Sequence, residues 1–176
     1  MMAPLIAFSL VGLVIFYVQH VVFFPYVHLR LLALLLFYVS LRPSLSLALG
    51  LSLVLGLLQD SYTTTPLGLH LGASLVLVAV ARLCRRGLLL RQLGFQVAVS
   101  LAALVLQEFC LHAGTFMLGY QPLFSHDLIK VHLMEILGTA ALGPLMYLLV
   151  QGVENLLRRL GWRPRSEPLT YQPFGD

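Results

Sequence analysis

The feature that most constrains this chain is a succession of long apolar runs that carry almost no charge. A helix needs roughly 20 apolar residues to cross the hydrocarbon core of a bilayer. These runs lack a single apolar face of period 3.6 or 2, which is typical of helices surrounded by lipid. The sequence therefore predicts an all-α, polytopic membrane protein. Six runs are candidate spans: Ala3–Phe24, Tyr26–Leu41, Ser44–Leu58, Pro66–Leu83, Leu93–Leu111 and Val131–Gln151.

The composition argues against a water-soluble domain. Of the 176 residues, 59% are hydrophobic and only 10% are charged, whereas about a quarter of a soluble domain is charged. We expect one transmembrane helical domain over residues 1–160. Residues 161–176 are rich in Pro, Arg and polar side chains, so we expect them to form a flexible cytoplasmic tail.

The second and third runs are short, and only Arg42 and Pro43 separate them. They are either nearly upright spans or a hairpin that does not cross fully. Because backbone in the bilayer must be hydrogen-bonded internally, a shallow hairpin would have to be covered by neighbouring helices. We prefer six spans, with residues 113–130 as the longest outer loop.

The basic residues predict the orientation. With six spans, nine of the eleven Lys and Arg residues fall on one side, and only Arg30 and Lys130 lie opposite. The positive-inside rule then places both termini in the cytoplasm. This bias accounts for the net charge of +4, and no basic patch with interleaved aromatics indicates nucleic-acid binding. The nine are Arg42, Arg82, Arg85, Arg86, Arg91, Arg158, Arg159, Arg163 and Arg165.

Polar residues interrupt the apolar pattern in the stretch GLLQDSYTTTPLGLH, residues 56–70. Thr65 followed by Pro66 predicts a helix start, because the hydroxyl can cap free N–H groups and proline suits the first helical position. Gly68 and Gly72 then share one face, where small residues let another helix approach closely. We interpret the stretch as a joint with a packing face. Small residues with the same spacing in the preceding span are Ser46, Gly50, Ser52 and Gly56.

Asp60 is the one acid in this stretch. It is either a reactive carboxylate or a turn residue that accepts hydrogen bonds from backbone N–H groups, and we favour the turn role. In that role, exchange for asparagine should leave assembly largely intact.

Further ionisable residues lie near the predicted outer surface. An ionisable group inside a span costs about 2.5–3.5 kcal/mol on insertion scales, so these groups should face protein or water. Three interpretations of these ionisable residues are open. They form a metal or proton site, they line a pocket for a small polar solute, or they make a polar seam that orders helix packing and receives a partner helix. We favour the seam and predict no metal or cofactor, because H-E-x-x-H is absent. The outer polar seam comprises Asp60, His70, Glu108, His112, His132 and Glu135.

Catalytic motifs are absent from the sequence: it has no GxSxG, no Walker A and no GxGxxG after a strand. We therefore predict a non-enzymatic protein. An intramembrane hydrolase stays open as a further class, and it would need paired reactive groups within hydrogen-bond reach.

An outer Asp after the third span, a few polar residues and then Pro-Leu-Gly make a pattern that resembles the rod shape-determining protein family MreD. The matched positions are Gly56, Asp60, Pro66 and Gly68. The chain length, the short middle spans and the basic inner loop also look like that family, so the resemblance covers most of the chain. The long outer loop departs from the shortest family members.

The resemblance implies a subunit of the bacterial cell-elongation complex in the inner membrane. Such a subunit would bind the transmembrane helix of MreC and work with the actin-like MreB and with the elongation transpeptidase and glycosyltransferase of peptidoglycan synthesis. The family is also similar in architecture to substrate-binding subunits of vitamin transporters. A small-solute transport subunit is therefore the alternative function.

Overall fold

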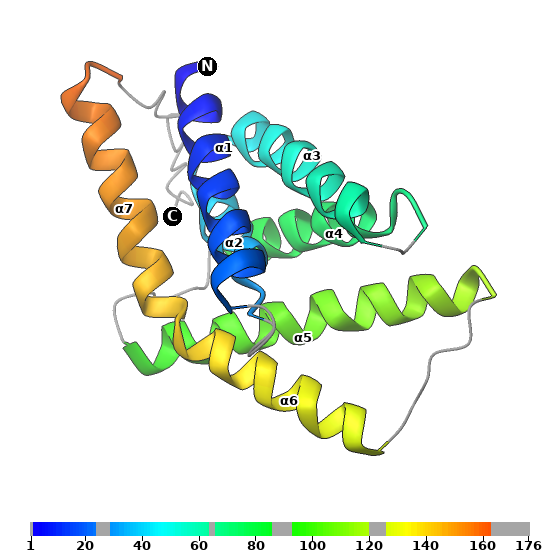
Figure 1. The fold of residues 1–176 in the computed structure, drawn as a ribbon. Helices are drawn as coiled ribbons and strands as arrows, with labels where there is room; N and C mark the ends of the chain where they lie inside the picture. The colour runs from blue at the N-terminus through cyan, green and yellow to red at the C-terminus, as the bar shows by residue number, and fades with distance from the viewer. Residues whose placement is uncertain (1, 24–28, 64–65, 86–92, 120–125, 163–176) are drawn as a thin grey trace, which may run out of the picture.

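The computed structural model describes residues 2–23, 29–63, 66–85, 93–119 and 126–162. Within them the chain forms seven α-helices and one π-helical turn (Figure 1). The predicted all-α class is confirmed for this part of the chain. In order, the elements are α1 (Met2–Tyr17), the π-helical turn η1 (Val18–Phe23), α2 (Leu31–Ser40), α3 (Leu45–Tyr62), α4 (Leu69–Cys84), α5 (Leu93–Met117), α6 (His126–Ala141) and α7 (Gly143–Arg159).

Three stretches in the described residues are long and apolar enough to cross a membrane: Met2–Val21, Leu45–Tyr62 and Gly94–Met117. They correspond to the first, third and fifth predicted spans, whose helical character is confirmed, while the third and fifth helices extend beyond their predicted ends. The sixth adds a fourth candidate if its two bent halves are counted as one span. The second and fourth predicted spans form shorter apolar helices, α2 and α4.

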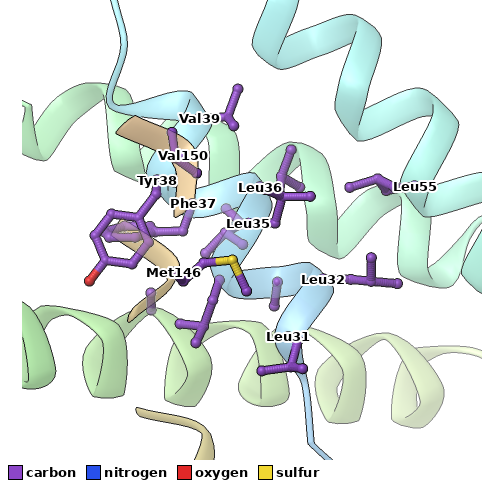
Figure 2. Close-up of a cluster of buried hydrophobic side chains, with 14 of the residues drawn as sticks. Leu31, Leu32, Leu35, Leu36, Phe37, Tyr38, Val39, Leu55, Met146 and Val150 are labelled. Atoms are coloured by element: carbon purple, nitrogen blue, oxygen red, sulfur yellow. The ribbon is translucent and has the colours of Figure 1, made fainter. Parts of the chain in front are cut away.

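Helix α2 is the centre of the packed core. Every one of its ten residues is buried, and Figure 2 shows its side chains surrounded by residues from other helices, including Leu55 of α3 and Met146 and Val150 of α7. At 1.5 Å per residue, α2 is about 15 Å long, half the thickness of a bilayer core. Its neighbours give it the cover that a short membrane-embedded helix requires.

The outer surface is apolar along several helices. Side chains on one side of α1, such as Leu10 and Val14, are each 60% exposed, and Leu145 and Leu148 are similarly exposed on α7. Soluble monomers rarely expose contiguous apolar patches larger than a few hundred Å². An exposed surface of this kind is suited to lipid.

The predicted span Val131–Gln151 is not one straight helix. α6 and α7 meet at a bend of 45° around Leu142. Pro144 lies in the first turn of α7, where its missing N–H is tolerated, whereas inside a continuous helix it would remove a hydrogen bond. Gly143 lies against the hydroxyls of Ser100 and Tyr38. The bend therefore combines a local proline break with a close contact between α7 and the core.

Several predicted boundaries move. α3 starts as expected, with the Ser44 hydroxyl accepting a hydrogen bond from the Leu47 N–H at 3.3 Å, but it continues to Tyr62. The predicted outer loop over residues 113–130 is shorter, because α5 reaches Met117 and α6 begins at His126. The apolar runs end before these helices do, since the outer turns of the helices are polar. Residues 163–176 of the predicted tail lie outside the described residues.

Candidate binding site

Asp60 joins α3 to α4. Its side chain is buried in the last turn of α3, and its carboxylate accepts hydrogen bonds from three backbone N–H groups at the start of α4. Oδ2 accepts from Gly68 at 2.9 Å and from Leu71 at 3.3 Å, and Oδ1 accepts from His70 at 2.9 Å. The negative charge also suits a helix N-terminus. The interpretation of Asp60 as an acceptor of backbone N–H groups is confirmed.

The predicted helix start at Thr65 and Pro66 is wrong. α4 begins at Leu69 with Gly68 as the N-cap residue, Pro66 precedes the helix, and Thr65 lies outside the described residues. The physical reason is that the capping group comes from another helix: the Asp60 carboxylate takes the role expected of a hydroxyl next to the proline.

Two glycines make this joint possible. Gly68 has φ of +96°, a left-handed conformation that a side chain would strain. A Cβ on Gly56 would lie 2.8 Å from Leu71 Cα, so α3 and α4 pack at a distance that only glycine permits. The joint therefore uses Gly56, Asp60 and Gly68, three of the four positions of the family-like pattern.

The predicted packing residues of α3 are used within the chain. Gly50 faces Leu5 of α1 and Gly56 faces α4, while Ser52 is fully buried and donates to Leu49 O at 2.8 Å. These positions are not open to a partner. Ser46 is exposed. Nothing lies within 4 Å of a Cβ added at Gly68 or Gly72, so these two glycines at the start of α4 face outward.

Glu108 of α5 forms a salt bridge with Arg30, which precedes α2. Its other carboxylate oxygen is 3.4 Å from His112 Nδ1. The sequence predicts Arg30 and Glu108 on the same side of the membrane but does not pair them. An acidic side chain inside a membrane span is energetically costly unless it is paired, so the sequence indicated only that Glu108 needs a cation on the same side.

His132 and Glu135 of α6 continue this polar region. His132 Nδ1 is 3.3 Å from a Glu135 carboxylate oxygen, and the rings of His132 and His112 are 6.4 Å apart, edge to face. The structure thus groups Glu108, His112, His132 and Glu135, while Asp60 and His70 meet at the α3–α4 joint. Within the described ranges, no three His, Cys, Asp or Glu side chains are placed to hold a metal ion.

A pocket of about 220 Å³ lies between the joint and the Arg30–Glu108 pair. Among its polar lining residues, only His70 belongs to the outer polar seam that the sequence predicted. The others come from four segments that the chain alone does not show to converge. The polar lining comprises Gln19, His20, Arg30, Gln59, Thr63, His70 and Gln107.

The π-helical turn η1 contributes Gln19 and His20 to this pocket. Gln19 Oε1 accepts a hydrogen bond from the Leu31 N–H at 3.1 Å, at the start of α2. His20 Nδ1 donates to Phe16 O at 2.9 Å. π-Helical turns are rare and occur frequently at functional sites. Here the wider turn coincides with the polar wall of the pocket.

A second polar group lies at the other ends of α2 and α4. Arg42 is 3.2 Å from a Glu154 carboxylate oxygen of α7 and stacks 5.8 Å from the Tyr147 ring centre. Arg82 donates to Pro43 O at 3.0 Å. Two predicted orientation residues therefore also hold helix ends together. Arg86, Arg91, Arg163 and Arg165 lie outside the described residues.

Comparison of the chain with protein-family models, with curated proteins and with solved structures finds no match.

Proposed function

We propose that the chain is a multi-pass protein of the bacterial inner membrane with six passes and both termini in the cytoplasm. The contacts of Arg42 with Glu154 and of Arg82 with Pro43 gather basic residues at one group of helix ends. Arg30 at the start of α2 and the Asp60 joint between α3 and α4 lie at the opposite ends of these helices, and Arg30 pairs there with Glu108 of α5. This separation supports an alternating path through the bilayer, with α2 crossing inside the protein.

Its proposed role is that of a non-enzymatic subunit of the bacterial cell-elongation complex that binds the transmembrane helix of MreC. In this role it helps to couple peptidoglycan synthesis to cell shape, together with MreB and the elongation transpeptidase and glycosyltransferase. The observation that carries the proposal is the α3–α4 joint. Three positions of the family-like pattern, Gly56, Asp60 and Gly68, build that joint.

The joint leaves one face of α4 open. Gly72 is exposed with nothing within 4 Å of an added Cβ, Val76 one turn further is 41% exposed, and Ala79 follows on the same side, also exposed. Lipid offers no hydrophobic gain for helix association, so close van der Waals packing against small residues supplies much of the attraction. A partner helix can approach α4 closely along this face.

Gly72→Leu tests the docking face. We expect MreC recovery in co-purification from native membranes to fall several-fold, because the leucine keeps the helices apart, while membrane insertion is unchanged. Gly68→Leu is unsuitable because its positive φ makes any side chain strained.

The matched control is Gly152→Leu on α7, an exposed helical glycine with nothing within 4 Å of an added Cβ. It should leave MreC recovery at the wild-type level. Equal recovery with Gly72→Leu and wild type would contradict the docking face on α4.

A solute-binding subunit of a small-molecule transporter is the second candidate, and the polar pocket favours it. Depletion of the protein separates the two functions. Loss of rod shape with unchanged vitamin uptake supports the elongation role, and loss of uptake in cells of normal shape supports transport.

A further inference from the structure

The polar pocket contains hydrogen-bonding atoms that the described part of the chain leaves unmatched. Gln107 is only 3% exposed, and its Oε1 is buried with no hydrogen-bond partner. His70 Nδ1 on α4 is also buried with no hydrogen-bond partner. Buried polar groups are nearly always hydrogen-bonded, so these two atoms indicate that something polar occupies the space between them.

His20 adds a second acceptor beside Gln107 Oε1, whereas His70 Nδ1 donates or accepts according to the ring tautomer. His20 Nδ1 donates to Phe16 O at 2.9 Å, so in the neutral ring Nε2 is an acceptor. His20 on η1 and Gln107 on α5, the residues that carry these two acceptors, both line the pocket. The complementary occupant carries N–H or O–H donors.

The charges around the pocket are already neutralised. Arg30 and Glu108 form a salt bridge, and both carboxylate oxygens of Asp60 accept backbone N–H groups. An ion entering the pocket would lose hydration without gaining a free counter-charge. The occupant is therefore expected to be uncharged.

The size and the apolar part of the lining restrict the occupant further. A volume of about 220 Å³ corresponds to about seven waters at roughly 30 Å³ each, which is below the usual 300–1,000 Å³ of drug-sized sites. Leu29 and Leu111 line the pocket beside the polar groups. This combination suits a small molecule that has an apolar part and a polar donor group.

We propose that this pocket is a binding site for a small uncharged molecule that has an apolar part and a primary carboxamide or an equivalent donor group. The inference goes beyond the docking of a partner helix and does not depend on it. The pocket lies where η1, the end of α3 and the beginnings of α2 and α4 meet the α5 side chain Gln107. A ligand there contacts five elements at once and stabilises their arrangement.

Three pyridine probes of equal size test the proposal on the full-length protein in detergent. Nicotinamide is neutral, nicotinate is an anion and 3-(aminomethyl)pyridine is a cation at neutral pH. Nicotinamide at ten times its dissociation constant should raise the midpoint of thermal unfolding by about 3 °C or more, and the two ions should raise it less.

Gln107→Leu removes the unmatched amide at nearly constant volume and should abolish the nicotinamide shift. The matched control is Gln151→Leu, the same change at an exposed position of α7, which should keep the shift. If Gln107→Leu does not fold, His70→Phe is the second variant, since it replaces the other unmatched group by an apolar ring.

Two outcomes overturn the proposal. Either no shift with nicotinamide in the wild-type protein, or an equal shift in wild type and Gln107→Leu, means that the pocket holds only water. MreC recovery measured with Gln107→Leu separates this result from the proposed function: unchanged recovery leaves the docking role standing whatever the probes show.

Discussion

At the scale of single residues, Asp60 is the most informative side chain. It is an acid in an apolar chain, and the structure uses both of its oxygens to accept backbone N–H groups from α4. This is a helix cap supplied from the preceding helix, with its charge at the favourable end of the helix dipole. The expectation that asparagine would be well tolerated here is revised, because an amide has one acceptor oxygen and its NH₂ would face a donor.

Asp60→Asn should lower the free energy of unfolding by about 1–3 kcal/mol, the cost of leaving a buried donor unsatisfied. The measurement is thermal unfolding of the purified protein in detergent. Ser61→Ala is the control, because Ser61 is the exposed neighbour and bonds only Leu58 O within its own helix. An unfolding midpoint for Asp60→Asn equal to that of Ser61→Ala would rule out the capping role.

At the scale of elements, the break between α6 and α7 shows how a local signal and a distant contact act together. Pro144 ends the continuity of the helix. Gly143 then allows α7 to approach the hydrogen-bonded hydroxyls of Tyr38 and Ser100, which are 2.8 Å apart. The bend therefore belongs to the packing around α2 as much as to the proline.

Gly143→Ala should destabilise the protein by about 1–3 kcal/mol through overpacking, because its Cβ meets Ser100 Oγ and Cβ and Tyr38 Oη. Gly138→Ala on α6 is the matched control. Nothing lies within 4 Å of its added Cβ, so higher helix propensity should leave stability unchanged or raise it by up to about 1 kcal/mol. Adding Ser100→Ala should restore part of the loss at position 143, and a fully additive double variant would contradict the proposed contact.

At the scale of the whole molecule, the polar groups separate into two regions. Arg42 and Arg82 take part in contacts at one group of helix ends, and Arg30 pairs with Glu108 at the other. Apolar side chains are exposed along several helices, as a protein embedded in a bilayer requires. This arrangement connects the helix packing to the proposed orientation in the membrane.

Cysteine labelling in intact spheroplasts tests the orientation. In a chain with both native cysteines replaced, Leu118→Cys at the end of α5 should react with a membrane-impermeant thiol reagent. Arg85→Cys at the end of α4 should react only after permeabilisation. Labelling of Arg85→Cys from outside would invert the proposed topology and remove the outer location of the polar pocket.

The sequence by itself determined the features that depend on local pattern. Apolar runs predicted the helical membrane class, Ser44 marked the start of α3, and Asp60 was identified as an acceptor of backbone N–H groups. These follow because burial, capping and turn preference act between near neighbours in the chain. The polar cluster was also expected at one surface, although its pairs were not.

Only the tertiary structure decided which distant groups meet. The Arg30–Glu108 pair, the complete burial of α2 and the pocket with the unmatched Gln107 amide all join segments far apart in the chain. In an apolar helix, the sequence does not distinguish side chains that face lipid from those that face protein, since both surroundings are apolar. Hydrophobic pattern could therefore predict the helices of this protein, while close packing selected the faces that touch.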